Sequence, residues 1–323
     1  MIEAIPIQLV IILVGLAATM AFVGLNAILL VYLERKVAGF IHRRPGPYEV
    51  GPHGILQPFA DGLKLVGKQI FTPTGADSFL YWLAPMISMA PAIVCFLVIP
   101  FGPHLLIFNT NVGLVLILAF TGINVLALCI AGWTSQNKYS LLGAARGVSQ
   151  SVAYEIPLLL SVLPIIFMTG TFNMYDITMG QGSWPWQWFI VYQPLAFIIF
   201  FICALAETNR APFDLPEAES ELTAGFHTEY SGMGFALFFL SEYAYMVIAA
   251  CVTAVLFLGG FQGPGADGWW WFLAKVYVLL LIMIWIRWTF PRVRFDQLLN
   301  ICWKWLIPLA VINLLVTLLV IAL

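Results

Sequence analysis

Eight stretches of this 323-residue chain are almost entirely apolar and long enough to cross a lipid bilayer. A helix needs about 20 apolar residues to span the roughly 30 Å of hydrocarbon in a membrane. Only 9% of the residues are charged, which excludes a soluble protein because a water-facing surface needs charge. The sequence therefore predicts an all-α integral membrane protein with eight transmembrane helices at 7–33, 79–101, 112–133, 149–172, 188–206, 234–259, 272–290 and 303–323.

Positive charge is distributed unevenly between the connections of these helices. Lys and Arg are retained on the cytoplasmic side of membranes. They follow the first, third, fifth and seventh predicted helices, whereas the opposite connections at 102–111, 173–187 and 260–271 contain neither. Lys275, just inside the outer end of the seventh helix, is the exception. We expect both termini on the outer side, which is the periplasm or its topological equivalent in an organelle.

The connection between the first two predicted helices is too charged to span a membrane. Between positions 55 and 70, apolar residues recur every three to four positions, and Asp61, Lys64 and Lys68 take the other side. This pattern predicts an amphipathic helix that lies along the inner interface. No internal repeat or linker divides the chain, so we expect one membrane domain over 1–323.

The sequence lacks the patterns typical of bound metals, clusters or nucleic acid. A net charge of −2 without a basic patch argues against a nucleic-acid partner. The five cysteines are far apart and lack the spacing of iron–sulfur or zinc ligands. None of the four histidines lies in the middle of a predicted span, where it would ligate haem. We therefore expect no metal and no cofactor bound by this chain.

Acidic residues inside the spans are the strongest functional signal. A charge away from water costs at least about 2.5–3.5 kcal/mol in a membrane helix. Glu155, Glu207 and Glu242 fall in the cytoplasmic half of their predicted helices. Buried carboxyl groups can exchange protons near neutral pH, so we predict a proton relay. The alternative is that each acid is a structural anchor, paired with an arginine or hydrogen-bonded between helices.

The loop after the fifth predicted helix departs from the usual cytoplasmic composition. It contains one cation, Arg210, among acids at positions where Lys and Arg are normally enriched. The apolar residues and prolines between these acids indicate a packed loop rather than a merely solvated one. Dense carboxylates in such a loop have coupled titrations, so we predict an electrostatic sensor. The acids are Glu207, Asp214, Glu217, Glu219, Glu221 and Glu229.

Three motifs identify a family. The chain has Leu-Glu-Arg-Lys at 33–36, Leu-Gln-Pro-Phe-Ala-Asp-Gly-Leu-Lys-Leu at 56–65 and Glu-Thr-Asn-Arg-Ala-Pro-Phe-Asp-Leu-Pro-Glu at 207–217. In this order they resemble the H subunit of complex I, the NADH:quinone oxidoreductase. Lys-Tyr-Ser-Leu-Leu-Gly at 138–143 and Glu-Ser-Glu-Leu at 219–222 match as well. One departure is Tyr48, where the family usually has Asn.

The resemblance implies a subunit without a redox centre that forms much of the quinone chamber and links quinone reduction to proton pumping. The complex would lie in an energy-transducing membrane, such as the bacterial inner membrane. Iron–sulfur clusters and flavin are expected in partner subunits. The expected partners are a hydrophilic quinone-reducing module with the terminal iron–sulfur cluster, the small and antiporter-like membrane subunits, quinone and lipid.

The resemblance also assigns two groups of residues. Those expected around the quinone entrance are Glu34, Arg35, Lys36, Phe59, Asp61, Arg210 and Phe226. Those expected to couple quinone reduction to proton movement are Glu155, Glu207, Asp214, Glu217, Glu219, Glu221, Glu229 and Glu242.

Two other functions fit the composition. One is the equivalent membrane subunit of a related complex with a hydrogenase or another electron donor. The other is a stand-alone secondary transporter, which buried acids and broken helices favour but the absence of an internal repeat disfavours.

Overall fold

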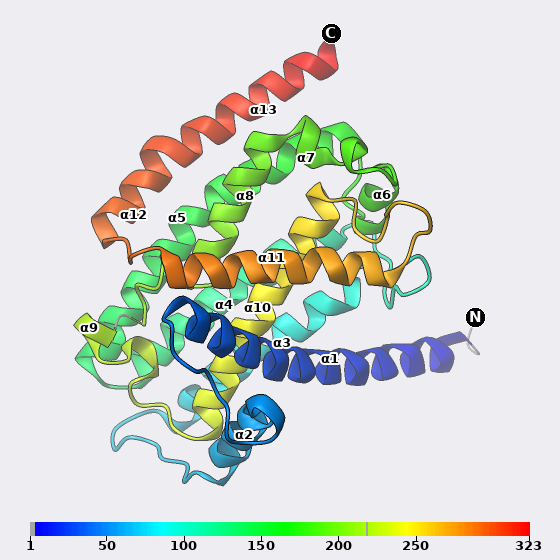
Figure 1. Ribbon diagram of the computed structural model, residues 1–323. Coiled ribbons are helices and arrows are strands. Elements are labelled where there is room, and N and C mark those ends of the chain that lie inside the picture. The colour runs from blue at the N-terminus through cyan, green and yellow to red at the C-terminus, as the bar shows by residue number, and fades with distance from the viewer. Residues whose placement is uncertain (1–3, 218) are drawn as a thin grey trace.

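Helices are the regular elements of the part of the chain that the structure describes (Figure 1). The computed structural model describes residues 4–217 and 219–323, with side chains from residue 12 onward except those of residues 219 and 220. In chain order the elements are α1 (Ala4–Ile41), η1 (Pro52–Gly54), α2 (Gln57–Gly67), α3 (Ser78–Val98), α4 (Gly113–Thr134), α5 (Lys138–Thr169), α6 (Met174–Met179), η2 (Pro185–Gln187), α7 (Phe189–Tyr192), α8 (Pro194–Glu207), α9 (Glu219–Leu222), η3 (Gly225–His227), α10 (Met233–Phe257), α11 (Trp269–Thr289), α12 (Phe295–Ile301), the π-helical turn η4 (Cys302–Leu306) and α13 (Ile307–Ala322).

Seven helices in this described part are long and apolar enough to cross a membrane. This agrees with the predicted all-α membrane protein. The seven are Ile12–Ile41, Ser78–Val98, Gly113–Thr134, Lys138–Thr169, Met233–Phe257, Trp269–Thr289 and Phe295–Ala322.

The span predicted at 188–206 is divided in two. The 4-residue α7 ends at Tyr192, and the 14-residue α8 begins at Pro194. Proline has no backbone N–H and pushes the residue before it out of the helical region, and Gln193 has φ −131° and ψ 57°. At 1.5 Å per residue, α8 alone is about 21 Å long, which is less than the hydrocarbon thickness. The structure therefore gives seven full-length spans and one shorter apolar helix among the described residues.

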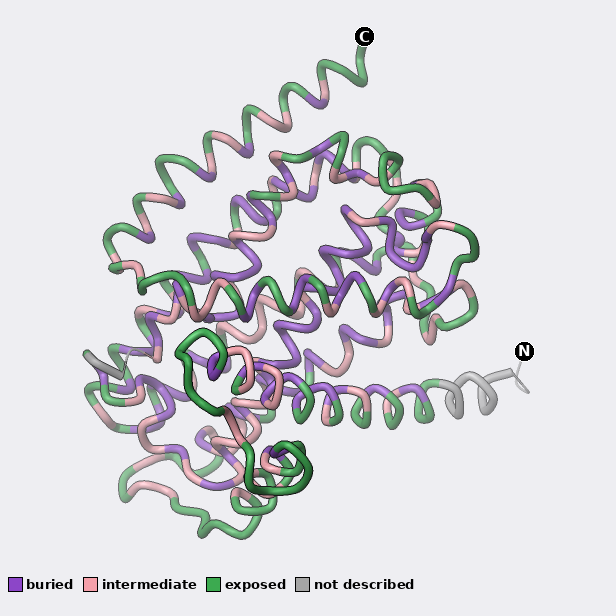
Figure 2. The backbone as a smooth tube through the Cα atoms, in the orientation of Figure 1, coloured by how far each residue is buried: buried purple, intermediate pink, exposed green. Residues whose placement is uncertain are grey.

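Helix α10 is the centre of the packing, in contact with α1, α3, α8 and α11. Of the 18 most apolar consecutive residues of α10, 61% are buried. In the corresponding stretch of Phe295–Ala322, 17% are buried. Figure 2 shows the same contrast, with buried residues concentrated on the central helices and exposed residues along α13. Side chains that α10 directs inward are therefore shielded from both lipid and water.

Helix α2 forms in the segment predicted to be amphipathic. Phe59, Leu63 and Val66 are exposed, and Lys64 is exposed as well. The guanidinium of Arg35, on α1, donates to Asp61 at 2.5 Å and joins α2 to the bundle. Figure 1 shows α2 beside the end of α1 that carries this arginine, and the connection from α1 to α2 runs over the same region.

Candidate functional site

The acidic loop is anchored to α5 by a buried glutamine. The side-chain amide nitrogen of Gln150 donates to the carbonyl oxygen of Ala206 at 2.7 Å and to that of Phe213 at 2.8 Å. An unpaired amide in this position would cost about 1–3 kcal/mol, so the two bonds stabilise the loop against the helix. They fix both ends of the segment that contains Arg210.

Two glycines bring the distant halves of the loop together. Gly225 has φ +55°, and a Cβ there would lie 1.6 Å from the carbonyl oxygen of Pro216. A Cβ on Gly143 of α5 would lie 2.9 Å from the same oxygen. Only glycine allows this approach, because any side chain would overlap the backbone. The contact places Glu217, just after Pro216, close to His227.

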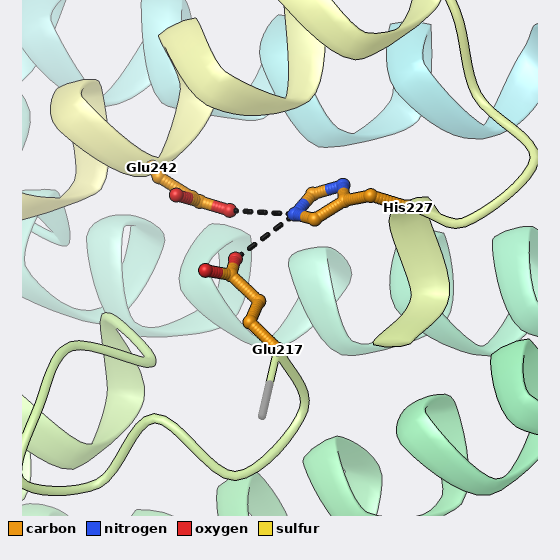
Figure 3. A group of neighbouring side chains, drawn as sticks. All are labelled: Glu217, His227 and Glu242. Atoms are coloured by element: carbon orange, nitrogen blue, oxygen red, sulfur yellow. Dashed lines mark hydrogen bonds and ion pairs between the residues drawn. The ribbon is translucent and has the colours of Figure 1, made fainter. Parts of the chain in front are cut away.

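His227 lies between two carboxylates that come from different elements (Figure 3). Its Nε2 is 2.9 Å from Oε1 of Glu217, in the loop, and 3.2 Å from Oε1 of Glu242, on α10. The imidazole is buried, and its Nδ1 has no hydrogen-bond partner. Phe226, Phe235 and Phe238 surround the ring.

The environment changes the proton affinity of the two loop residues. Burial alone would lower the pKa of His227, but the hydrogen bonds to Glu217 and Glu242 outweigh it and raise this pKa to about 9. Burial, together with the nearby Glu242 charge, raises the pKa of Glu217 to about 7. At neutral pH the imidazolium therefore lies beside a carboxyl group that readily gains and loses a proton.

The same three side chains offer the donor set of a metal site. One ligand atom each from Glu217, His227 and Glu242 lies within 4.8 Å of the others, and this is the one such group found among the described residues. Imidazole nitrogen and carboxylate oxygen are both zinc ligands. The expectation that this chain binds no metal stays a prediction.

A second buried group surrounds Glu34 of α1. Its Oε2 accepts from Arg210 at 3.1 Å and from the Tyr243 hydroxyl at 2.7 Å, and its Oε1 accepts from Arg287 of α11. The Arg210 guanidinium also stacks on the Tyr243 ring at 4.2 Å. Tyr243 follows Glu242 on α10, so the group around Glu34 and the group around His227 adjoin each other.

Of the other predicted coupling residues in the loop, Asp214 lies near Glu217, and the others have separate partners. Asp214 accepts from Arg292 at 3.0 Å, and burial and the Glu217 charge raise its pKa. Glu229 accepts from the Asn137 amide at 2.7 Å. Glu221 is exposed and pairs with Arg146 at 2.5 Å. The side chain of Glu219 lies outside the described residues.

The carboxyl group of Glu155, on α5, and that of Glu207, at the end of α8, lie near each other and near α4. A Cβ at Gly122 of α4 would be 3.3 Å from Oε1 of Glu155, so this glycine makes room for the carboxylate. Glu207, the last residue of α8, lines a cavity of about 30 Å³ with Thr121 and Tyr245. A cavity of this size accommodates a water molecule.

The predicted quinone-binding residues are not gathered in one place. Glu34 and Arg210 are paired, and Arg35 and Asp61 are paired. The Lys36 ammonium donates to the carbonyl of Pro47 at 2.8 Å and holds the turn after α1. The Phe59 side chain is exposed on α2, whereas Phe226 is 1% exposed and packs on Phe238.

Sequence reasoning missed three members of these groups. In the sequence, His227 is considered only among the histidines excluded as haem ligands, and neither Arg287 nor Tyr243 is assigned a role in a site. The first carries a usable signal, because it is the single imidazole within a loop of acids. Arg287 carries none, since it is 253 residues from Glu34 in the chain.

The fold and these groups define a polytopic helical membrane protein with ionisable side chains buried against one another. A model of the NADH dehydrogenase family matches residues 14–318. The chain belongs to this family.

Several curated relatives are similar over nearly their whole length. A protein of Desulfotalea psychrophila is 52% identical over 309 residues, which covers 92% of this chain and 93% of the relative. A protein of Dehalococcoides mccartyi is 45% identical, covering 94% and 85%, and one of Protochlamydia amoebophila is 47% identical, covering 88% and 90%. All three are named as the H subunit of an NADH-quinone oxidoreductase.

Proposed function

We propose that this chain is the quinone-side membrane subunit of a proton-translocating NADH:quinone oxidoreductase, and that it links quinone reduction to proton pumping. Membership of the NADH dehydrogenase family and the names of the relatives support this function. The observation that carries the coupling role is His227, held between the carboxylates of Glu217 and Glu242 and adjoining the buried Glu34 group.

The membrane arrangement follows from the charge distribution. Helices α7 and α8 together form the remaining crossing, which gives eight spans with both termini on the outer side. Helix α2 lies on the inner interface, with Phe59 and Val66 directed into the lipid boundary. The whole chain forms one domain in an energy-transducing membrane, such as the bacterial inner membrane.

Quinone would enter on the inner side, where α1, α2 and the acidic loop meet. The residues assigned there are Glu34, Arg35, Lys36, Phe59, Asp61, Arg210 and Phe226. Reduction of a quinone takes up electrons and then protons, so the local charge changes at each step. Arg210 is well placed to transmit this change, because it is buried, touches Glu34 and stacks on Tyr243.

The response of this chain would be a redistribution of protons. Arg210 stacks on Tyr243, the residue that follows Glu242 on α10. A change in charge near Arg210 would therefore alter the electrostatic potential at Glu242. The imidazolium of His227 can then release a proton to Glu217, whose pKa of about 7 lets it pass the proton on. Asp214, Glu219, Glu221 and Glu229 would extend this acidic surface, and Glu155 and Glu207 would begin the path toward the antiporter-like subunits.

This function requires partners that carry the redox chemistry. A hydrophilic module with a terminal iron–sulfur cluster would deliver electrons, and flavin would lie in another partner. The chain itself would bind quinone but no cofactor. The names of the relatives do not favour a hydrogenase complex or a stand-alone transporter.

The test compares two activities of one assembled preparation. Glu242→Gln keeps the shape of the side chain but removes its proton exchange. NADH oxidation with a hydrophilic acceptor, which takes electrons upstream, should be unchanged, whereas quinone reduction and proton pumping should fall together on the order of 100-fold.

The matched control is Glu49→Gln, the same chemical change at an exposed glutamate. It should leave both activities at the wild-type level. Wild-type quinone reduction and pumping in Glu242→Gln would show that this carboxylate is only a structural anchor. Loss of NADH oxidation with the hydrophilic acceptor as well as of quinone reduction would indicate failed assembly. Glu242→Asp would then be measured in place of Glu242→Gln.

A further inference from the structure

A cavity of about 610 Å³ opens at the end of the bundle that we assign to the outer side. It lies between α1, the segment at 101–107 and the first turn of α11. Figure 1 shows the N-terminal half of α1 and the beginning of α11 at this same end. Among the described residues that line it, none is assigned to quinone or to coupling. The cavity is therefore separate from the groups around Glu34 and His227.

The position of the cavity along α1 places it in the outer half of a bilayer. Its lining residues on α1 run from Val14 to Phe22. Glu34 follows Val14 by about 20 residues, or about 30 Å, which is the thickness of the hydrocarbon. The stretch from Val14 to Phe22 covers about 12 Å of this depth. Trp269, which also lines the cavity, is of the residue type that marks the membrane interface.

The walls of the cavity are almost entirely apolar. Its polar lining groups are the Thr19 hydroxyl, the His104 imidazole and the Trp269 indole. The Thr19 hydroxyl donates to the carbonyl of Leu16 in its own helix at 2.9 Å, so its proton is already used. His104 and Trp269 are exposed. Apolar cavities do not hold water, so a group that fills this one must be hydrocarbon.

Aromatic rings close the cavity toward the middle of the membrane. Phe22 packs edge-on against Phe96 and Phe101, with ring centres 5.7 and 5.2 Å apart. Phe101 packs in the same way on Phe272 at 5.3 Å. A transmembrane helix is about 10–12 Å wide and runs through the whole bilayer, so it does not fit a cavity that ends halfway. A single acyl chain is narrow and flexible, and it can enter from the outer side.

Contacts within the protein hold these walls in place. A Cβ on Gly15 would lie 2.5 Å from Cγ2 of Ile107, so this glycine lets the isoleucine pack directly on α1. The Phe101 backbone N–H donates to the carbonyl of Leu105 at 3.1 Å and closes the turn between them. A Cβ on Gly102 would lie 3.6 Å from Cβ of Trp269, so this turn contacts the beginning of α11. The cavity is therefore preformed.

The mouth of the cavity carries negative rather than positive charge. The segments 102–111 and 260–271, which flank it, contain Asp267 but no Lys or Arg. Asp267 is exposed and lies two residues before Trp269. Lys275, the first cation of α11, donates to three backbone carbonyls instead. A carboxylate attracts the ammonium of a zwitterionic head group and repels a head group with a net negative charge.

We propose that this cavity binds one acyl chain of a zwitterionic phospholipid from the outer leaflet. The chain fills the apolar space between α1 and α11. The head group lies at the level of Trp269, with its ammonium toward Asp267, and the exposed His104 imidazole offers an N–H to its phosphate. The site is independent of quinone binding, because Glu34 is about 18 Å further along α1 than Phe22.

Any apolar surface in a membrane touches lipid, so a bound chain must be distinguished from the surrounding bilayer. Two adjacent alanines on α1 provide a matched pair. Ala18 lines the cavity, at helical spacing from Val14 and Phe22, whereas Ala17 is on another face of the helix and does not line it. Both are exposed, so they differ in which space they border and not in exposure. A larger side chain should exclude the bound chain only at position 18.

The experiment uses the assembled complex in phosphatidylcholine nanodiscs with a trace of phosphatidylethanolamine that carries a photoreactive group in its acyl chain. After illumination, labelled peptides are mapped by mass spectrometry. We expect labelling of segments 14–22 and 101–107. It should decrease about fivefold in Ala18→Phe, because ring and chain cannot share one space, and less than about twofold in Ala17→Phe. Equal labelling of the two variants would overturn the proposal in favour of ordinary boundary lipid.

A phosphatidylglycerol probe with the same photoreactive chain tests the charge at the mouth. It should label these segments about threefold less than the phosphatidylethanolamine probe, as expected for one exposed charge. The difference should disappear in Asp267→Asn. It should persist in Asp176→Asn, the same change at an exposed acid of α6. Equal or stronger labelling by phosphatidylglycerol in the wild type would overturn the zwitterionic assignment.

Two further outcomes would assign the cavity to another occupant. Labelling of these segments by a quinone with a photoreactive isoprenoid tail, lost in Ala18→Phe, would assign it to quinone. Failure of every probe to label them in the wild type would show that a partner subunit covers the cavity. Assembly of each variant is verified by NADH oxidation with the hydrophilic acceptor. Ala18→Leu replaces Ala18→Phe if that variant does not assemble.

Discussion

Buried polar side chains occur at both ends of the helices, and they are satisfied in different ways. At the outer end, the Lys275 ammonium donates to the carbonyl oxygens of Leu258, Gly260 and Gln262 at 2.5, 3.0 and 2.5 Å. It also lies 4.1 Å from the centre of the Trp188 ring. The three N–H groups of this ammonium thus match three backbone acceptors.

At the inner end, ionisable side chains face other ionisable side chains. Glu34 is paired with two arginines, and His227 contacts two glutamates. Several buried atoms remain without a partner, including Nη2 of Arg210, Oδ1 of Asp214 and Nδ1 of His227. Glu217 and His227 can therefore exchange a proton with each other, which the backbone acceptors of the outer site cannot do with Lys275.

This difference separates a charge with a structural role from the group that we propose to couple proton movement. A backbone carbonyl cannot take up a proton, so the Lys275 ammonium makes fixed hydrogen bonds that hold the end of α10. A carboxylate beside an imidazole can exchange a proton, so the group around His227 can adopt more than one protonation form. Burial alone does not distinguish them, since both side chains are 8% exposed.

The largest expected effect is on stability at the outer site. Lys275→Met keeps the length of the side chain but leaves three buried carbonyls without their donor. Each unpaired group costs about 1–3 kcal/mol, so the total should reach about 3 kcal/mol or more. We expect a marked decrease in the amount of assembled complex and in its unfolding temperature.

The control for this prediction is Lys304→Met, the same change at an exposed lysine. Exposed substitutions usually stay within about 0.5 kcal/mol of wild type, so assembly should be normal. If the two variants assembled and unfolded alike, Lys275 would not be a structural charge and the contrast between the two ends would be lost.

The sequence was a good guide to elements whose signal is continuous. Spans predicted at 79–101 and 112–133 correspond to α3 and α4 within a few residues. Helix α5 begins at Lys138, before the predicted start at 149. Gly143 and Gly147 hide this early start, because glycine is a poor helix former. In the structure they pack against Pro216 and Gly225, and this tertiary contact favours the helix.

The candidate site was less predictable because its contacts are distant in sequence. The acids were recognisable from the cost of burying a charge, whereas their partners depend on packing. Arg210 is 176 residues from Glu34, and Tyr243 is 209 residues from it. One sequence without its relatives gives no signal for such pairs. The role of each predicted residue in quinone binding or coupling remains a prediction.

A smaller effect is expected from pH at the inner site. The pKa of His227 is raised from its ordinary value of 6.5 to about 9, so the stabilising imidazolium is fully present below 6.5 and is lost as pH rises through about 9. Quinone reduction by the assembled enzyme should therefore stay nearly constant up to about pH 9 and fall above it, approaching tenfold per pH unit. His227→Gln cannot bind the proton, so this alkaline decline should disappear in the variant.

One control measurement separates the titration of His227 from that of groups in other subunits. Activity with the hydrophilic acceptor, followed over the same pH range, corrects for alkaline effects on the electron-donating module. The groups that face the His227 imidazole are Glu217 from the loop and Glu242 from α10. An alkaline decline that persists unchanged in His227→Gln would assign it to another residue.

The smallest effect is expected at the exposed acid of the acidic loop, Glu221, which we compare with the buried acid Glu217. Glu221 pairs with Arg146 at the surface, and the hydrogen bond from this arginine holds the pKa of Glu221 below its ordinary value. Glu217 is buried, and its pKa is raised to about 7. Glu221 therefore stays ionised at neutral pH, whereas Glu217 gains and loses a proton there.

We expect Glu221→Gln to alter quinone reduction only slightly and Glu217→Gln to lower it strongly, with both variants fully assembled. The measurement is quinone reduction at low and at high salt, because salt screens an exposed charge but not a buried one. A salt-sensitive, equal loss in both variants would mean that the loop acts through its total negative charge, as a surface for docking the hydrophilic module, rather than through the proton shared by Glu217 and His227.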